Sequence, residues 1–305
     1  MNRLEWMNDN YPMRRTKAEK EAFAAYVAEN YSARMEVTSD GKNKNLIIGD
    51  PSRARVICTA HYDTPAKALF PNLMIPRNNF LFFLYQFFMI GVILAVSILG
   101  GFLTERVTAR EEGFFFGFLV LYYLIFFLGF LAFPNKHNKN DNTSGVATVL
   151  ALAETCSRED VAFILFDNEE GGKRGSKAYF KDHKDKMKDT FLINFDCVGN
   201  GENVIFIAQK RAESREEWEM LKSVFMPEGD YTPFFYPAKG SQCNSDHKSF
   251  PIGVGCMACR RTKKGLFYTP YIHTDRDTVA RGENVDYITA GVGAFFDTLK
   301  QKEKA

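Results

Sequence analysis

The 305-residue sequence carries little net charge and no long basic stretch. A formal net charge of +2 argues against nucleic acid as a partner, because proteins that bind nucleic acids gather lysine and arginine on one surface. Residues 1–40 lack the apolar segment of a secretory signal peptide, so we expect no exported leader. Internal repeats are absent, and the only biased tract is one phenylalanine-rich block.

The six cysteines do not have the spacing of a disulfide framework or of a zinc finger. Cys256 and Cys259 form one CxxC pair, but no second pair accompanies it. Most of the cysteines lie in apolar stretches with strand-like or helical patterns, which is typical of buried free thiols. We therefore expect reduced core thiols and a reducing compartment.

Two long stretches without any charged residue interrupt the chain, from Phe80 to Leu103 and from Phe114 to Phe133. About 20 helical residues cross a hydrocarbon layer of about 30 Å, and both stretches reach that length. Both are apolar on every face, unlike the helices of soluble proteins. The short polar connector Thr104–Gly113 predicts an inserted transmembrane hairpin, residues 80–133, that lies in the lipid bilayer. The alternatives are a buried core hairpin and an oligomerisation arm.

An even number of crossings returns the chain to the side that it left. More basic residues flank the hydrophobic block on that side than lie in the connector, which places the large domain in the cytoplasm by the positive-inside rule. The flanking residues are Arg77, Lys136 and Lys139, with Lys67 further away, and the connector contains Arg106 and Arg110. We therefore expect an integral membrane protein with two helices and a cytoplasmic domain.

The remaining residues, 1–79 and 134–305, are expected to form a single discontinuous domain. Apolar runs of strand length alternate with helical patterns, which predicts a three-layer α/β/α domain around a largely parallel mixed sheet. The expected strands are Asn45–Gly49, Arg55–Ala60, Val161–Asp167, Phe191–Asp196, Val204–Ala208 and Val254–Ala258. The expected helices are Lys17–Tyr31, Thr143–Glu154, Ser214–Phe225 and Val285–Lys300.

Five polar motifs stand where predicted strands run into loops or helices, which is where α/β proteins bind their ligands. Together they offer two imidazoles and several carboxylates but no thiol, a set that suits zinc and less often cobalt or manganese. The motifs are His61-Tyr-Asp63, Asp141-Asn142, Glu169-Glu170, Asp196 and His273.

Single motifs of this kind carry little weight. His61 and Asp63 point to the same side of a strand end, so Asp63 can hold the second ring N–H of a metal-bound histidine. Alone, however, the pair is more typical of a surface or core contact. Glu169-Glu170 alone would be a solvated acidic loop, but the surrounding run Phe-Asp-Asn-Glu-Glu-Gly-Gly favours a site.

The number of acids favours two metal ions over one. Asp141, Glu170 and Asp196 bring three negative charges together, and without cations their repulsion would force some of them to hold protons. Two divalent ions with a bridging hydroxide neutralise those three ligands.

The motifs also occur together in a familiar order. His-x-Asp, Asn-Asp-Asn-x-Ser-Gly, Asp-Asn-Glu-Glu-Gly, Ser-Asp-His and Ile-His-Thr-x-x-Asp-Thr resemble the motifs of metallopeptidase family 28. That family contains bacterial leucyl aminopeptidases, aminopeptidase Y and glutamate carboxypeptidases, and glutaminyl cyclase is a relative. The resemblance begins at about residue 45 and skips roughly residues 65 to 134.

The resemblance implies two zinc ions per chain that share one bridging carboxylate, that of Asp141. It implies that His61 and Asp196 complete one site and that Glu170 and His273 complete the other.

The resemblance implies that Glu169 is the general base, which takes a proton from water between the metals and passes it to the leaving amine. Asp63 is also expected to be a catalytic residue, which holds the second ring N–H of His61. A cis peptide bond between Asp141 and Asn142 is also expected.

One motif departs from the family pattern. Some members carry a tyrosine three residues before the serine of Ser-Asp-His, where it stabilises the oxyanion, and Gln242 stands there in this chain. Gln242, Tyr268 and Tyr271 are therefore the candidate oxyanion donors. Asp246 is expected to support the site, and His247 is interpreted as structural rather than as a ligand.

These features predict a membrane-anchored zinc exopeptidase, in the first place an aminopeptidase. The alternatives are a metal-dependent carboxypeptidase or amidohydrolase, an acyltransferase similar to glutaminyl cyclase, and a non-catalytic receptor or scaffold. Asp141 lies seven positions after Pro134, and such a linker spans at most about 25 Å. We therefore expect the catalytic mouth beside the membrane and a preference for membrane-associated or hydrophobic peptides.

Overall fold

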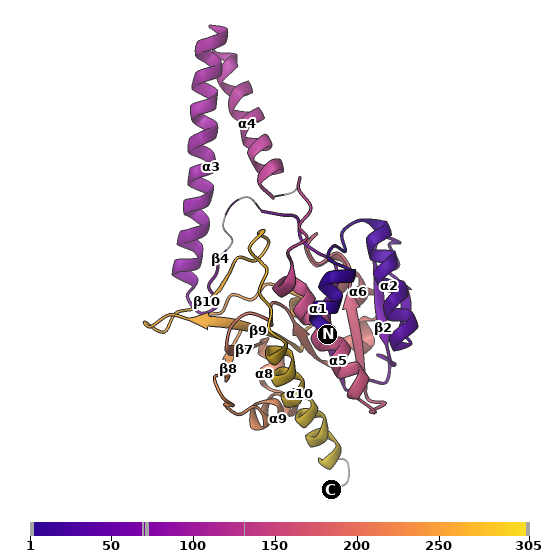
Figure 1. The fold of residues 1–305 in the computed structure, drawn as a ribbon. Helices are drawn as coiled ribbons and strands as arrows, with labels where there is room; N and C mark the ends of the chain where they lie inside the picture. Colours follow the sequence, from indigo (N-terminus) through magenta and orange to yellow (C-terminus); the bar gives the residue numbers. More distant parts are fainter. Residues whose placement is uncertain (1–2, 69, 71–72, 131, 303–305) are drawn as a thin grey trace.

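A computed structural model describes residues 3–68, 70, 73–130 and 132–302 of the chain. An α/β body carries a long pair of helices that projects from one side, between β4 and the segment that leads into α5 (Figure 1). The body contains both stretches that were expected to form one domain, before and after the hairpin.

A ten-stranded mixed sheet forms the middle layer, in the order β1-β2-β5-β3-β6-β9-β10-β4, with β7 paired to β8 and β9. The inner strands β5, β3, β6 and β9 run parallel to one another, whereas the outer pairings, except β7 with β8, are antiparallel. The strands are Arg34–Val37 (β1), Lys44–Ile48 (β2), Val56–His61 (β3), Leu73–Met74 (β4), Val161–Phe166 (β5), Phe191–Phe195 (β6), Asn203–Ala208 (β7), Thr232–Pro237 (β8), Gly253–Arg261 (β9) and Phe267–Pro270 (β10).

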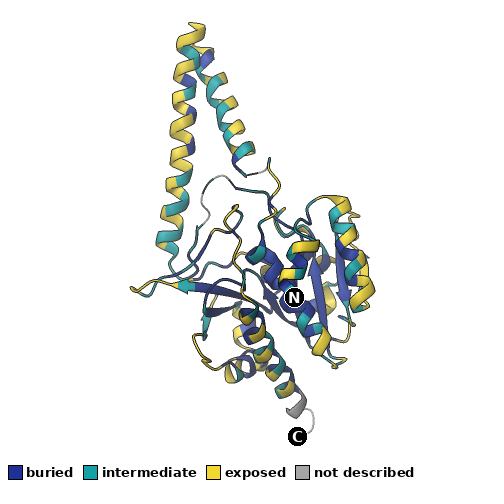
Figure 2. Ribbon diagram, viewed as in Figure 1, coloured by how far each residue is buried: buried dark blue, intermediate teal, exposed yellow. Residues whose placement is uncertain are grey.

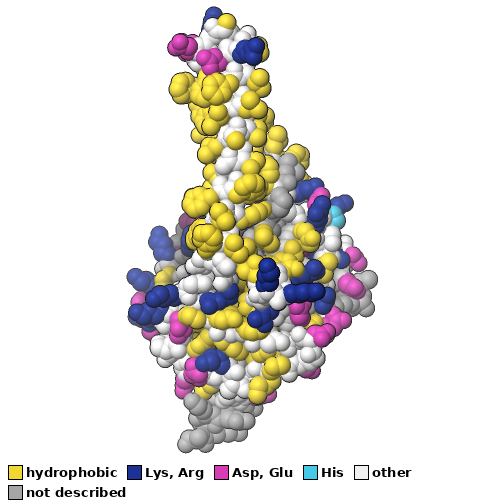
Figure 3. Space-filling model, turned by 90° about the vertical axis from the view of Figure 1, so that its left-hand side faces the viewer, with side chains coloured by type: hydrophobic (Ala, Val, Ile, Leu, Met, Phe, Trp, Pro, Cys, Tyr) yellow, Lys and Arg dark blue, Asp and Glu magenta, His cyan; other side chains and the backbone are white. Residues whose placement is uncertain are grey.

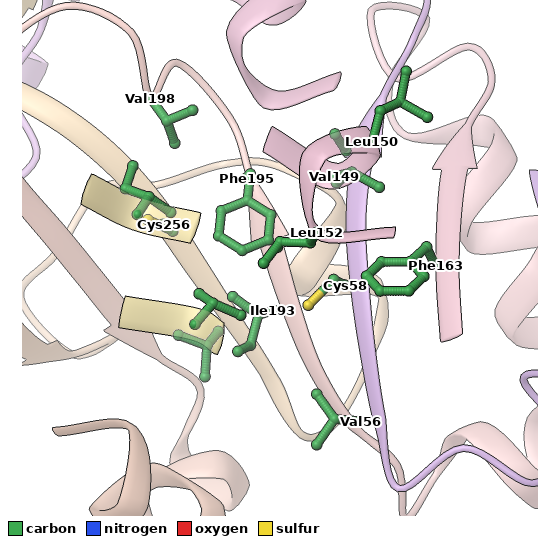
Figure 4. Close-up of a cluster of buried hydrophobic side chains, with 14 of the residues drawn as sticks. Val56, Cys58, Val149, Leu150, Leu152, Phe163, Ile193, Phe195, Val198 and Cys256 are labelled. Carbon is green, nitrogen blue, oxygen red and sulfur yellow. The ribbon is translucent and has the colours of Figure 1, made fainter. Parts of the chain in front are cut away.

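Helices cover both faces of this sheet. Successive residues of β3 point to opposite faces, so that Val56 and Cys58 join one hydrophobic cluster and Ile57 joins the other. The first cluster includes side chains from α1 (Arg3–Asn10), α2 (Lys17–Tyr31), α5 (Gly145–Thr155), α9 (Glu216–Val224) and α10 (Gly282–Lys302). Figure 4 shows the part of this cluster in which Val149 and Leu152 of α5 lie beside side chains of the sheet. The second includes side chains from α6 (Arg174–Asp182) and α7 (Lys184–Met187). The expected three-layer α/β/α architecture is confirmed.

The predicted elements lie close to their expected positions, and α2 has the expected bounds. A capping box explains where α2 begins, because Thr16 accepts from the N–H of Glu19 while the Glu19 carboxylate accepts from the N–H of Thr16. The strands β1, β4, β8 and β10 were not predicted from the sequence. These strands are short or only partly buried, so they have no continuous apolar run to mark them.

The projecting pair consists of α3 (Asn79–Thr108) and α4 (Glu112–Phe130). Both helices are long and apolar enough to cross a membrane, and most of their residues are exposed (Figure 2). That exposure excludes a hairpin buried in the core of this chain. The turn is shorter than the expected connector, because α3 continues one turn past its apolar part and ends at Ala109 in a left-handed conformation. Leu131, within the second predicted span, lies outside the described residues.

Small residues bring α3 and α4 close together. A Cβ atom on Gly117 would lie 2.2 Å from Thr104 Oγ1 and 3.0 Å from the carbonyl oxygen of Gly100. Gly100 and Gly101 likewise face Leu121 and Phe114 of the other helix at contact distance. Glycine at such positions is typical of membrane helices, which gain stability from close packing rather than from hydrophobic burial.

Replacement of Gly117 by leucine should therefore weaken the hairpin. The added side chain overpacks the interface, which costs about 1–3 kcal/mol, so the melting temperature in detergent should fall. Gly91→Leu is the matched control, since a Cβ atom at Gly91 meets nothing within 4 Å. Equal melting temperatures for the two variants would contradict close packing of α3 against α4.

Candidate metal centre

The polar motifs meet at the carboxyl edge of the parallel strands. His61 is the last residue of β3, Asp196 follows β6 directly, and Glu169 and Glu170 lie in the loop after β5. The register pairs His61 with Phe166 of β5, so these strands end level with each other. Asp141 reaches the same edge from the irregular turn before α5, and His273 reaches it from the loop after β10.

Asp141 stands between the two histidines and offers one carboxylate oxygen to each. Its Oδ1 lies 3.3 Å from His61 Nε2, and its Oδ2 lies 2.9 Å from His273 Nε2. Asp196 Oδ1 lies 3.8 Å from His61 Nε2, and Glu170 Oε2 lies 3.4 Å from His273 Nε2. Two groups of three ligand atoms, each within 4.8 Å of one another, therefore share Asp141.

The site contains buried nitrogen and oxygen atoms without hydrogen-bond partners among the residues that the structure describes, and these atoms are suited to bind zinc. His61 Nε2 and Glu170 Oε1 are buried and have no hydrogen-bond partner in the described part of the chain. Buried polar atoms are normally paired, so each of these atoms lacks a partner that a cation would supply. The nitrogen and oxygen donors match those that zinc prefers.

The charges lead to the same conclusion. Burial and the neighbouring Asp141 carboxylate together raise the pKa of Glu170 to about 8, although His273 opposes the shift. Burial also raises the pKa of Glu169 well above its usual value. Burial alone would lower the pKa of His273, but Glu170 and Asp141 raise it to about 10. The crowded acids therefore need either protons or cations to remain together.

Asp63 supports the site through the acidic loop as well as through its predicted contact with His61. Its carboxylate accepts the backbone N–H of Glu169 at 2.9 Å and that of Glu170 at 3.2 Å, which fixes the acidic loop. His61 Nδ1 lies 3.1 Å from the backbone carbonyl of Asp63 but 3.6 Å from its carboxylate. The predicted contact of Asp63 with the His61 ring is present but longer than a hydrogen bond, and the same carboxylate also accepts the two loop amides.

Asp277 holds the bridging residue, a role that sequence reasoning missed. Its two carboxylate oxygens accept the backbone N–H groups of Asn140 at 3.0 Å and of Asp141 at 2.9 Å. The available signal was its position in the Ile-His-Thr-x-x-Asp-Thr motif. The peptide bond between Asp141 and Asn142 is cis, as expected.

The turn also depends on Asn142 and Gly145. Asn142 donates to the carbonyl of Phe195 at 3.0 Å and accepts the N–H of Gly145 at 3.1 Å, which connects the turn to β6. A Cβ atom on Gly145 would lie 2.3 Å from both Asn142 Oδ1 and the Phe195 carbonyl oxygen, so only glycine fits there.

The other predicted residues lie around the centre in different ways. Asp246 is fully buried without a hydrogen-bond partner among the described residues, and burial raises its pKa to about 7. Burial lowers the pKa of His247 to about 3, so this histidine is neutral, and it joins none of the ligand groups in the described chain.

A cavity of about 300 Å³ opens over the centre. None of the three candidate oxyanion donors, Gln242, Tyr268 and Tyr271, is among its described lining residues. Tyr268 and Thr269 are neighbours on β10 and point to opposite sides, and it is Thr269 that lines the cavity. Apolar side chains form one wall, and they come from β4, α3, β9 and the loop after β10: Met74, Phe82, Met257 and Ile272.

Fold and site together define a metal-dependent hydrolase with an α/β exopeptidase fold. A family model described as peptidase family M28 matches residues 134–291, which is more than half of the chain. The chain belongs to this family of zinc-dependent peptidases. A sequence comparison with curated proteins gives no match.

Solved structures with the same fold have low sequence identity to the chain. A zinc-dependent exopeptidase from Parabacteroides distasonis is 15% identical with a TM-score of 0.55, and the alignment covers 95% of each chain. Glutaminyl cyclase from Porphyromonas gingivalis is 13% identical with a TM-score of 0.57, over 97% of this chain and 96% of that one. The LapA aminopeptidase of Legionella pneumophila is 14% identical with a TM-score of 0.53, and the alignment covers 96% of this chain and 68% of that one.

Replacement of Asp277 by alanine should weaken zinc binding about ten- to hundredfold, as is common when a residue that positions a metal ligand is removed. The substitution leaves the backbone N–H groups of Asn140 and Asp141 without their acceptor. A chelator titration measures the affinity. Asp275→Ala is the control, since Asp275 is half exposed and pairs only with Lys67 in the described structure. Equal zinc affinities in the two variants would contradict the role of Asp277.

Proposed function

We propose that this chain is a membrane-anchored di-zinc aminopeptidase. The observation that carries the proposal is the bridging position of Asp141 between two groups of ligands, His61 with Asp196 and Glu170 with His273. Zinc bound there would polarise the scissile carbonyl and lower the pKa of water. Cobalt or manganese could replace it, because the same donors bind those metals.

The chain's own residues would manage the proton and the substrate. Glu169 lines the cavity, and one of its carboxylate oxygens lies within 4.8 Å of ligand atoms of His61 and Glu170. It would take the proton of the attacking water and give it to the leaving amine. Asp63 would keep Glu169 in place through its hydrogen bond to the loop.

The two hydrophobic helices would anchor this centre to a bilayer. Their exposed apolar surface has no other partner within the described chain, and their turn carries both acidic and basic residues. The basic residues that flank the helices on the domain side favour a cytoplasmic catalytic domain.

The substrates would be hydrophobic or membrane-associated peptides. Phe82 belongs to the first turn of α3, which is one of the proposed spanning helices, yet it lines the cavity over the metal centre together with Met74. The substrate side chain next to the metals would therefore contact a wall that continues into the membrane anchor.

Two substitutions at adjacent acids test the chemistry. Glu169→Gln should lower the cleavage of aminoacyl anilides at least about a hundredfold, the usual loss with a general base, and should leave the zinc content unchanged. Glu170→Gln is the matched variant and should lose zinc as well as activity. If both variants kept their activity, the proposed roles would be wrong.

The choice of substrate separates this function from its alternatives. An aminopeptidase cleaves peptides with a free amino terminus and leaves N-acetylated ones intact. Cleavage at the carboxyl end would indicate a carboxypeptidase, and cyclisation of an amino-terminal glutamine would indicate an acyltransferase. A folded protein that holds no metal and cleaves nothing would favour a receptor or scaffold.

Replacement of Phe82 by alanine should lower kcat/KM for peptides with a hydrophobic first residue by about tenfold, because about 1.5 kcal/mol of apolar contact is lost. Peptides with a polar first residue should be affected less. Phe87→Ala is the control, since Phe87 is exposed on the same helix and does not line the cavity. A Phe82→Ala enzyme with unchanged preference would show that the hairpin is only a tether.

A further inference from the structure

A second cavity lies at the base of α3, beside the turn between β9 and β10. Its volume is about 790 Å³. Four cationic side chains line it, and no acidic side chain is among its described lining residues: Arg77, Arg261, Lys263 and Lys264. Leu81, Leu266 and Phe267 add apolar surface. The cavity is therefore both basic and partly hydrophobic.

The two arginines are held in place by aromatic rings. The guanidinium carbon of Arg77 lies 4.0 Å from the ring centre of Tyr236, and Arg77 donates to Ser241 Oγ at 2.6 Å. Arg261 lies 4.9 Å from the ring centre of Phe267. Stacked guanidinium groups are ordered before any ligand arrives and are well suited to bind phosphate.

Their charge is not neutralised by the protein. None of the four cationic side chains forms an ion pair within the part of the chain that the structure describes. Lys263 and Lys264 are exposed at the turn. An anion could therefore contact all four without displacing an acidic residue.

The position along α3 matches the headgroup layer of a bilayer. Helical residues rise about 1.5 Å each, so a hydrocarbon layer of about 30 Å that begins near Leu103 ends about 20 residues earlier, near Phe83. Leu81 then lies about 3 Å and Arg77 about 9 Å beyond that level. The headgroup layer is about 5–8 Å deep on each side, so Leu81 lies within it and the long Arg77 side chain can reach it. Lys and Arg side chains gather around the base of the hydrophobic column, whereas both signs of charge occupy its far end (Figure 3).

We propose that this cavity binds the phosphate group of an anionic phospholipid in the leaflet next to the catalytic domain. The guanidinium and ammonium groups would donate to the phosphate oxygens, and Leu81 and Leu266 would contact the start of the acyl chains. The inference rests on the membrane anchoring in the proposed function but not on the peptidase activity.

The bound lipid would orient the catalytic domain on the bilayer. Leu81 lines the lipid cavity and the next residue, Phe82, lines the cavity over the metal centre. A lipid that fixes this turn of α3 would therefore also fix one wall of the substrate cavity.

The test uses the full chain in detergent and measures lipid binding by native mass spectrometry, with phosphatidylglycerol as the probe and phosphatidylcholine as the neutral reference. The intact protein should retain more phosphatidylglycerol than phosphatidylcholine. A variant with Arg261→Gln, Lys263→Gln and Lys264→Gln should bind it at least about tenfold more weakly, because each basic residue near a membrane surface contributes to the affinity for anionic lipid.

The matched control removes three positive charges from exposed lysines outside the cavity, by Lys181→Gln, Lys184→Gln and Lys186→Gln. Its lipid affinity should be unchanged. If both triple variants lost lipid equally, the attraction would be non-specific and the site would be overturned. If the cavity variant misfolded, Lys263→Gln with Lys264→Gln at the exposed turn provides the same comparison.

Two further measurements show which part of the proposal is wrong if the result is negative. If glycerol phosphate displaced phosphatidylglycerol at equal concentration, the ligand would be a soluble phosphate and the lipid assignment would be wrong. Peptidase activity of the cavity variant in detergent should equal that of the intact enzyme. Loss of lipid binding with full activity therefore supports this site, whereas an inactive intact protein that binds lipid contradicts only the proposed function.

Discussion

Repulsion between buried carboxylates is the constraint on which this structure depends. Asp141, Glu170 and Asp196 meet at one edge of the sheet, where little water can screen their charges. The fold holds them through hydrogen bonds from outside the cluster, from Asp63 to the acidic loop and from Asp277 to the bridging turn. Such an arrangement needs protons or cations to remain together, and metal ions would supply positive charge at the positions where ligand atoms remain unpaired.

The hairpin contributes to the cavity over the metal centre as well as projecting from the domain. It leaves the domain after β4 and returns shortly before Asp141, and the first turn of α3 forms part of the cavity wall through Phe82. In a peptidase domain without a hairpin, loops alone could form the wall of the substrate cavity. In this chain the same wall continues into a helix that is long and apolar enough to span a bilayer, so the proposed anchor and the proposed substrate preference have one structural origin.

The sequence predicted what periodicity and charge can encode. The inner strands were visible as apolar runs, α2 as a helix from the spacing of its apolar residues, and the ligands as polar residues at strand ends. The edge strands were not visible, because their exposed residues have no continuous apolar pattern. Contacts across the chain were also hidden, so Asp63 was assigned to His61 and Asp277 to no role, and Phe82 was counted only as a membrane residue.

We propose that two metal ions share Asp141. Anomalous diffraction from crystals of the zinc-loaded protein, recorded on both sides of the zinc absorption edge, tests it most directly. We expect two peaks, one among His61, Asp141 and Asp196 and the other among Asp141, Glu170 and His273. A single peak, or peaks only at other residues such as His247, would contradict this proposal.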